Sequence, residues 1–321
     1  MNDATQTDLF AAPPGALEVP EIPPEHHTLA KSLPAGLRLG TTSWSYPGWT
    51  GLVYRANTST KLLASHGLTA YAQHPLFDAV EIDRTYYGPL PPSVFQSFAA
   101  SVPADFRFLV KAHEDCVVQR FPLHARYGKK RGMDNPRFLD AAYATDAVVA
   151  PFVEGLGEKG AALLFQFPPQ SKDDPRGFAD RLYGFLAALP KGITYAVELR
   201  NAELLTADYA AALEAAGAVH CHNVWTAMPP IHDQARRIPP AARRPLVVRW
   251  LLREGMTYEA ANARYAPFHR TVDPDDFRCD KLADLITRAV KHDVPALVLV
   301  DNKAEGCAPE SVVRLARALA R

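Results

Sequence analysis

The chain has 321 residues, of which 48% are hydrophobic, and its 35 lysine and arginine side chains balance 35 aspartate and glutamate side chains. This balance excludes a general electrostatic attraction to nucleic acid or to a membrane surface, although a local basic patch stays compatible with it. No apolar run approaches the roughly 18 residues of a membrane-spanning helix, and the four cysteines are widely spaced without a CxxC motif, which favours neither a disulfide framework nor a zinc knuckle.

The first 35 residues stand apart from the rest of the chain. Their prolines interrupt every periodic pattern: Pro13, Pro14, Pro20, Pro23, Pro24 and Pro34. Such a segment cannot bury enough apolar surface to offset its chain entropy. We therefore expect a Pro-rich, extended or disordered tail over residues 1–35 and a single folded domain over residues 36–321. The tail has no basic start or apolar core like that of a signal peptide, and with the cysteine pattern this indicates a cytoplasmic protein.

Eight short apolar runs follow the tail, and nearly all of them end in a polar residue. They are Leu37–Thr42, Ala79–Asp83, Phe106–Lys111, Ala162–Gln166, Thr194–Glu198, Ala218–His222, Leu246–Arg249 and Ala296–Asp301. Helical patterns lie between and after them, at Ser93–Ser101, Pro136–Phe152, Pro175–Leu189, Thr206–Ala216, Lys281–His292 and Pro309–Ala320. Alternating strands and helices predict a parallel sheet, and eight such units predict a closed α/β (β/α)₈ TIM-type barrel, with its chemistry at the C-terminal ends of the strands.

Two of the connections are long. Asp115–Asn135 carries a basic cluster, and Arg253–Asp276 follows the seventh strand. The basic cluster consists of Arg126, Lys129, Lys130 and Arg131. Loops of this length in a compact domain are usually functional or disordered.

Alternation along each strand predicts which side chains point into the barrel. Val80 and Ile82 should face the helices, which leaves Glu81 and Asp83 inside. In the sixth strand we expect His220 and His222 to point inward and Val219 and Cys221 outward. The side chains expected at the barrel mouth are Glu81, Asp83, Lys111, His113, Gln166, Glu198, Arg200, His220, His222, Arg249 and one of the pair Asp301 and Asn302.

So many buried charges cost free energy unless each one is paired or used. One interpretation is an active site in which Glu81 and Glu198 act as acid/base groups together with Lys111, because opposed charges can push two carboxylates to different pKa values. Lys111, Arg200 and Arg249 would then bind an anionic group such as phosphate or carboxylate. The other interpretation is a structural salt-bridge network that closes the barrel, with Glu81–Lys111 and Glu198–Arg249 as pairs.

Several motifs, in order along the chain, resemble those of the YecE-like family, which is also called domain of unknown function seventy-two. They are Gly40-Thr-Thr-Ser-Trp-Ser-Tyr-Pro-Gly-Trp-Thr-Gly with Tyr54, Val80-Glu-Ile-Asp with Thr85-Tyr-Tyr, Phe106-Arg-Phe-Leu-Val-Lys-Ala, Leu164-Phe-Gln-Phe-Pro-Pro, Ala196-Val-Glu-Leu-Arg, and Asp301-Asn-Lys with Gly306 and Ala308-Pro. The resemblance runs from about Leu37 to the end of the chain. It implies a TIM-type barrel and no established activity. The chain departs from the family at Asn201, where a histidine is frequent, and at Asp301, where an asparagine is frequent.

Aromatic residues cluster in the first two loops that follow strands. Trp44, Tyr46 and Trp49 lie in the first, and Tyr86 and Tyr87 lie in the second. Flat aromatic faces can stack on a sugar or on a nucleic-acid base, but the same residues could instead cap the barrel rim. The sequence has no GxGxxG after the first strand, no P-loop, no GxSxG and no HExxH, which disfavours nicotinamide enzymes, NTPases, α/β-hydrolases and zincins.

A metal site is possible but not favoured. Glu81, His113, Glu198, His222 and Asp301 could supply oxygen and nitrogen ligands around one cavity. However, nearby cationic side chains would already neutralise the carboxylates, and the paired local spacings typical of metal sites are missing. We therefore predict no cofactor and no metal ligand.

These observations favour an enzyme that acts on a small polar or anionic ligand, by a hydrolase, lyase or isomerase reaction. Two alternatives remain open: a nucleic-acid-binding or phosphoester-processing protein that uses the basic cluster, and a non-catalytic scaffold or sensor. The candidate catalytic residues are Glu81, Glu198 and Lys111. The candidate substrate-binding residues are Trp44, Tyr46, Asp83, Tyr87, His113, Gln166, Arg200, His222, Arg249 and Asn302.

Overall fold

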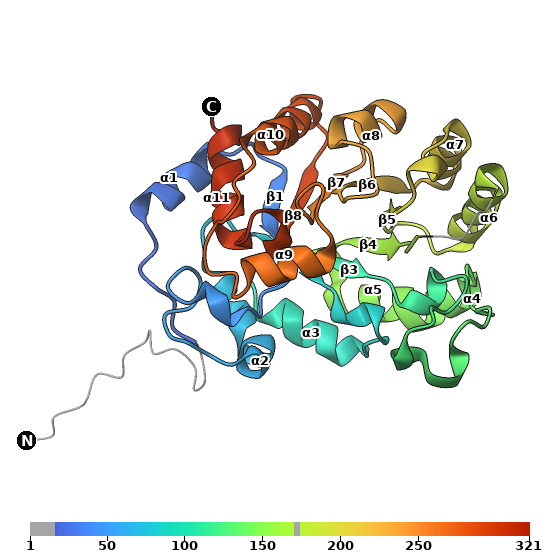
Figure 1. Cartoon of the computed structure of the whole chain (residues 1–321), viewed down its shortest axis with the longest axis horizontal. Helices are drawn as coiled ribbons and strands as arrows, with labels where there is room; N and C mark the ends of the chain where they lie inside the picture. The colour runs from blue at the N-terminus through green and yellow to red at the C-terminus, as the bar shows by residue number, and fades with distance from the viewer. Residues whose placement is uncertain (1–16, 170–173) are drawn as a thin grey trace, which may run out of the picture.

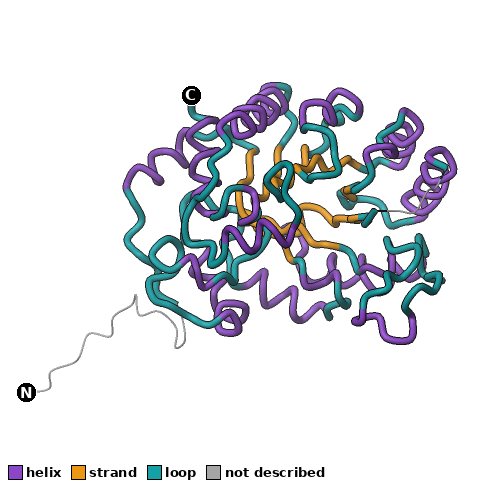
Figure 2. Tube along the Cα trace, viewed as in Figure 1, coloured by secondary structure: helices purple, strands orange, loops and turns teal. Residues whose placement is uncertain are grey.

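In the computed structural model, which describes residues 17–169 and 174–321, eight parallel strands close into a barrel in the order β1 to β8. The strands are β1 (Leu37–Thr41), β2 (Ala79–Ile82), β3 (Arg107–Lys111), β4 (Gly160–Gln166), β5 (Tyr195–Glu198), β6 (Val219–Val224), β7 (Leu246–Trp250) and β8 (Ala296–Val300). Figure 1 shows them at the centre of the molecule, and Figure 2 shows the helices arranged around them. This confirms the predicted (β/α)₈ TIM-type barrel.

The barrel closes where β1 pairs with both β2 and β8. Gly40 lies opposite Ala79 on one side, and Leu37 lies opposite Ala296 on the other. A side chain at Gly40 would overlap the carbonyl oxygen of Ala79. The first strand therefore needs a glycine at this position in order to approach its neighbour.

Helices cover the outside of the barrel. They are α1 (Pro24–Ser32), α2 (Thr60–Tyr71), α3 (Pro92–Ala100), α4 (Ala141–Ala144), α5 (Ala150–Leu156), α6 (Pro175–Ala188), α7 (Ala207–Ala216), α8 (Ile231–Arg237), α9 (Tyr258–Tyr265), α10 (Asp276–Lys291) and α11 (Ala308–Leu319). The sequence patterns did not predict α2, α8 or α9. Helix α9 lies inside the long connection after β7, and Figure 1 shows it in front of the strands. No helix in the described ranges is long and apolar enough to cross a membrane.

Part of the expected tail is helical. Helix α1 begins at Pro24, a residue well suited to the first turn of a helix, and Arg317 of α11 forms an ion pair with Glu25 in that turn. The expectation of an extended tail is therefore wrong for Pro24–Ser32, which forms a helix. Residues 1–16 lie outside the described residues.

The core has two layers that follow the alternation of the strands. Inside the barrel, small and medium apolar side chains such as Leu109, Leu164 and Leu299 pack together. Between strands and helices, a larger layer includes Val80, Ile82 and Val197. The predicted inward orientation of Glu81 and Glu198 is consistent with this arrangement, since their apolar neighbours face the helices.

The orientation predicted for the sixth strand is wrong. Val219 and Cys221 belong to the cluster inside the barrel. His220 instead faces the helix layer, where its Nδ1 lies 3.0 Å from the hydroxyl of Tyr209. His222 also faces outward, and its Nε2 lies 3.0 Å from the carbonyl oxygen of Ile238. Imidazoles can be buried wherever a partner is available, so their polarity did not identify the inner face.

Candidate functional site

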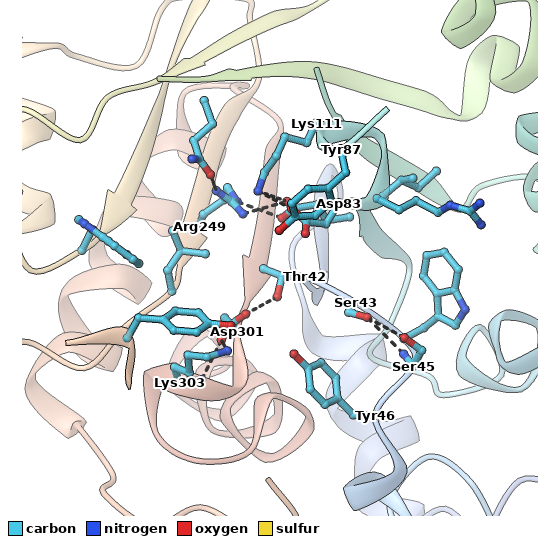
Figure 3. Close-up of a pocket in the computed structure, with 18 of the residues that line it drawn as sticks. Thr42, Ser43, Ser45, Tyr46, Asp83, Tyr87, Lys111, Arg249, Asp301 and Lys303 are labelled. Atoms are coloured by element: carbon cyan, nitrogen blue, oxygen red, sulfur yellow. Dashed lines mark hydrogen bonds and ion pairs between the residues drawn. The ribbon is translucent and has the colours of Figure 1, made fainter. Parts of the chain in front are cut away.

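A cavity of about 590 Å³ opens at the C-terminal ends of the strands. Figure 3 shows the side chains that line it. The sequence-predicted site residues that line the cavity are Trp44, Tyr46, Glu81, Asp83, Tyr87, Lys111, Gln166, Arg200 and Arg249. The barrel mouth is therefore an open pocket rather than a plug of packed side chains.

Arg249 at the end of β7 joins two carboxylates from distant strands. Its Nε and Nη2 donate to the two carboxylate oxygens of Glu81, over 3.0 and 2.8 Å. Its Nη1 donates to Oε2 of Glu198 over 2.6 Å. All three side chains are almost fully buried. The guanidinium is thus shared between two buried acids, and bidentate pairing of this kind fixes the orientation of the carboxylate.

Further ion pairs extend this cluster at both ends. Beyond Glu198, Nη2 of Arg200 lies 2.5 Å from Oε1 of that carboxylate. Beyond Glu81, Nζ of Lys111 lies 3.8 Å from Oε1 and also pairs with Asp83. The result is a line of alternating charges, which consists of Arg200, Glu198, Arg249, Glu81, Lys111 and Asp83. Both pairs expected from the sequence, Glu81–Lys111 and Glu198–Arg249, are present in it.

The acids of this line have different pKa directions. Burial raises the pKa of Glu81 to about 7, although Arg249 and Lys111 oppose the shift. Burial also acts to raise the pKa of Glu198, but Arg200 and Arg249 outweigh it and leave that pKa below its usual value. The pKa of Asp83 is lowered as well, because Lys111 and more distant cations outweigh its burial. Two carboxylates on one guanidinium therefore hold protons differently.

A second charged pair comes from the end of β8. Nζ of Lys303 lies 3.3 Å from Asp301, and the hydroxyl of Thr42 donates to the same carboxylate over 2.8 Å. Lys303 lies 4.4 Å above the ring of Tyr258, the first residue of α9. Burial acts to lower the pKa of Lys303, but Asp301 outweighs it and raises that pKa to about 12. Figure 3 shows this group of Thr42, Asp301 and Lys303 apart from the group around Lys111 and Asp83.

Four predicted site residues do not line the cavity. Glu198 points into the barrel, but it is fully buried and reaches the site through its two arginines. His113 lies 2.6 Å from the hydroxyl of Tyr143. Asn302 is buried and accepts from the indole of Trp49 over 3.0 Å and from the backbone of Ala308 over 2.8 Å.

His113, His222 and Asn302 thus lie outside the lining of this cavity. His222 faces the helices, as described above. Asn302 stabilises the first loop and the start of α11, so Asp301 is the residue of that pair that reaches the cavity. The contacts of His113 lie in the connection after β3, to which Tyr143 also belongs.

Sequence reasoning missed several lining residues. Lys303 lies two positions past its strand, Trp225 directly follows β6, and Tyr258 belongs to a helix in an expected loop. The parity argument ended at the strand ends and could not reach them. The Asp301-Asn-Lys motif was a usable signal for Lys303, because a lysine so close to a strand end cannot move far from the mouth.

The described residues contain no group of three or more His, Cys, Asp or Glu side chains placed to hold a metal ion. Asp83 and Asp301 are each paired with a lysine, and Glu81 and Glu198 are held by Arg249. A cation would have to displace these partners.

The basic cluster reaches the edge of the site through one residue. Arg126 pairs with Glu114 and lies 5.1 Å above the ring of Tyr87, which lines the cavity. Lys129, Lys130 and Arg131 are exposed. The basic cluster thus lies next to the barrel mouth, and of its four residues Arg126 is the one that contacts a residue of the cavity lining.

The chain matches the family model described as "Protein of unknown function DUF72" over residues 38–321, and no curated protein matches it. Two DUF72 family proteins of known structure, from Enterococcus faecalis and Thermotoga maritima, each share 17% identity and a TM-score of 0.58, over 88% of this chain and 97% of theirs. A D-tagatose 3-epimerase-like protein shares 13% identity and a TM-score of 0.51, over 88% and 97%. At such identities the likeness shows a common fold alone.

Proposed function

The chain belongs to the DUF72 family, and we propose that it is an enzyme that acts on a small, polar, anionic ligand by acid/base chemistry in which Glu81 transfers the proton. The fold argues only for the location of the site, because barrels of this type host many chemistries at the same end. The reaction has to be argued from the side chains themselves.

The relation between Glu81, Glu198 and Arg249 carries the proposal. Neighbouring carboxylates whose pKa values are pushed apart are typical of acid/base sites. Glu81 lines the cavity and has its pKa raised to about 7. It can therefore donate a proton and take it back near neutral pH. The pKa of Glu198 is lowered, so this carboxylate is ionised near neutral pH, and its ion pair helps to fix the position of Arg249.

Lys111 and Arg249 are positioned to assist Glu81. Both contact its carboxylate and both line the cavity. They stabilise negative charge on Glu81 after it has released its proton, and Arg249 fixes its orientation. Hydrolase, lyase and isomerase reactions all use a proton transfer of this kind.

The charges around the cavity support an anionic ligand. Among the described residues, five cationic side chains line it: Arg84, Lys111, Arg200, Arg249 and Lys303. Three carboxylates line it with them, Glu81, Asp83 and Asp301, and the buried Glu198 pairs with Arg200 and Arg249, so the cations exceed the carboxylates by one. Protonation of Glu81 increases this cationic excess. A ligand with a carboxylate or phosphate group would balance it.

A nucleic-acid-binding or phosphoester-processing role is the second candidate, and the contact of Arg126 with Tyr87 favours it. That contact brings a basic segment to the cavity edge, as a strand-binding groove would require. A non-catalytic scaffold finds less support, because paired charges alone would not leave an open cavity of about 590 Å³.

Substitution of Glu81 by glutamine tests the proposal. The amide keeps the shape of the side chain but cannot exchange a proton. With a turnover substrate in hand, we expect a loss of about 10²-fold or more in kcat for Glu81→Gln. A variant with unchanged kcat would show that Glu81 serves only the salt-bridge network.

A further inference from the structure

We propose that the ligand of this cavity is a sugar acid, a polyhydroxylated molecule of monosaccharide size that carries a carboxylate. This inference rests on the proposed function, because it names the substrate class of the same site. Three features of the cavity argue for it: exposed aromatic faces, aspartate–lysine pairs in its lining, and an arginine with unpaired donors.

The aromatic faces are Tyr87 and Tyr258. They are 65% and 51% exposed, and both line the cavity. They come from the second strand–helix loop and from the start of α9, yet the phenol of Tyr258 is near enough to affect the pKa of Tyr87. Aromatic rings left open in one pocket present apolar surface that a ligand can cover. The C–H face of a sugar ring is such a partner.

The aspartate–lysine pairs suit hydroxyl groups. The side chain of Asp83 is 41% exposed and binds Lys111 through Oδ1. Asp301 similarly pairs with Lys303. A hydroxyl group both donates and accepts, so it can satisfy the carboxylate and the ammonium of one pair together. A ligand with several hydroxyl groups can use both pairs.

Arg200 is the candidate for the acidic end of the ligand. Its guanidinium lies 3.8 Å above the ring of Trp225, which holds it in one plane. Nη2 pairs with Glu198, but Nε and Nη1 are buried and have no hydrogen-bond partner among the described residues. Unpaired buried donors are costly. Nε–H and Nη1–H point to different sides of the guanidinium, and a carboxylate oxygen accepts a charge-assisted hydrogen bond from a donor of this kind.

Size separates a sugar acid from simpler anions. A cavity of about 590 Å³ lies in the range that encloses a small organic ligand. Phosphate or acetate could neutralise Arg200, but neither has a face to cover Tyr87 or Tyr258. A neutral sugar could stack on the rings, but it would leave the donors of Arg200 unpaired. A ligand with both features uses the whole site.

Isothermal titration calorimetry with glucuronate, gluconate, glucose, acetate and phosphate at matched ionic strength tests the inference. We expect at least one sugar acid to bind about tenfold or more tightly than glucose, acetate or phosphate, since one charge-assisted hydrogen bond or one stacked ring each contributes about that much. The Tyr258→Ala substitution should lower the affinity for the sugar acid by about fivefold or more. The matched control is Tyr183→Ala, which removes a 44% exposed tyrosine on α6 outside the cavity and should change nothing.

Arg200→Lys tests the acidic end separately. Lysine keeps a positive charge for Glu198 but loses the Nε and Nη1 donors, so the ratio of the affinity for a sugar acid to that for glucose should fall toward one. Binding of acetate or phosphate as tight as that of the sugar acids would overturn the inference, and so would no binding of either sugar acid up to tens of millimolar.

Failure of this inference can be told apart from failure of the proposed function. Glu81→Gln should still bind the sugar acid while losing turnover. If it binds and turns over normally, the acid/base role is wrong and the ligand class stands. If no sugar acid binds but another small anion is turned over in a Glu81-dependent way, the ligand class is wrong and the acid/base role stands.

Discussion

Arg249 donates two parallel hydrogen bonds to Glu81 across the barrel mouth, although 168 positions of sequence separate the two residues. The third nitrogen of the same guanidinium, Nη1, donates a hydrogen bond to Glu198. A structural salt bridge and a catalytic acid/base pair would both contain these contacts. The two accounts differ in whether Glu81 carries a proton near neutral pH, and the following predictions separate them.

Removal of Arg249 should destabilise the fold. Arg249→Ala leaves Glu81 and Glu198 buried without their shared partner, and breaking a buried pair in this way costs about 3–5 kcal/mol. Urea denaturation measures the loss. Arg236→Ala is the control, since that exposed arginine pairs only with Asp233 on the surface and its removal should stay within about 0.5 kcal/mol. Equal effects of the two variants would contradict the description of Arg249 as a shared anchor.

Glu81 should make stability depend on pH. Its pKa in the folded protein is raised from an ordinary 4.5 to about 7, so between these values the folded state holds a proton that the unfolded state has released. The stabilising contribution is then complete at low pH and is lost as pH rises through 7.

Denaturation of the wild type and of Glu81→Gln at pH 5, 6, 7 and 8 checks this sign. Glutamine does not titrate, so the wild type should lose stability relative to the variant as pH rises over this window. A wild type that gains relative stability with rising pH would mean that Arg249 keeps Glu81 ionised throughout.

Gly40 should tolerate no side chain. In Gly40→Ala the added methyl group meets the carbonyl oxygen of Ala79 on the neighbouring strand, and overpacking against backbone should cost at least about 2 kcal/mol. Gly184→Ala on α6 is the matched control, because open space surrounds that position and alanine should there gain up to about 1 kcal/mol. Thermal unfolding of both variants gives the comparison, and a stable Gly40→Ala would place the β1–β2 contact in error.

The basic cluster should carry whatever affinity the protein has for nucleic acid. Replacement of Lys129, Lys130 and Arg131 by alanine leaves Arg126 in its contacts with Glu114 and Tyr87. We expect weak, salt-dependent binding of single-stranded DNA by the wild type and a smaller salt slope for the triple variant. Fluorescence anisotropy at several salt concentrations measures both. Tight binding that survives the substitutions would exclude these three residues as the contact surface.

The inner face of the barrel could be predicted from the sequence where apolar residues marked the outer face. Val80 and Ile82 faced the helices, and Glu81 was then assigned correctly. The same reasoning failed for His222, because Ile238 offers it a hydrogen-bond acceptor on the helix side. Strand alternation predicts orientation only when one of the two faces is unambiguously apolar.

The rest of the site depended on contacts that no local pattern contains. Tyr258 and Lys303 both line the cavity and contact each other, although they belong to different strand–helix units. The sequence also could not predict that Arg249 pairs with both Glu81 and Glu198, since strand alternation indicated only single pairs. The sequence did not predict helix α1, which packs against α11.

The most direct test of the account is the protonation state of Glu81 itself. Infrared difference spectra between the wild type and Glu81→Gln, recorded from pH 5 to pH 9, isolate the carbonyl stretch of this one carboxyl group. The account predicts a protonated-carboxyl band at pH 5 that disappears with a midpoint near the pKa of about 7. Absence of that band at pH 5 would show an ionised Glu81 locked to Arg249, and it would contradict the proposed acid/base role.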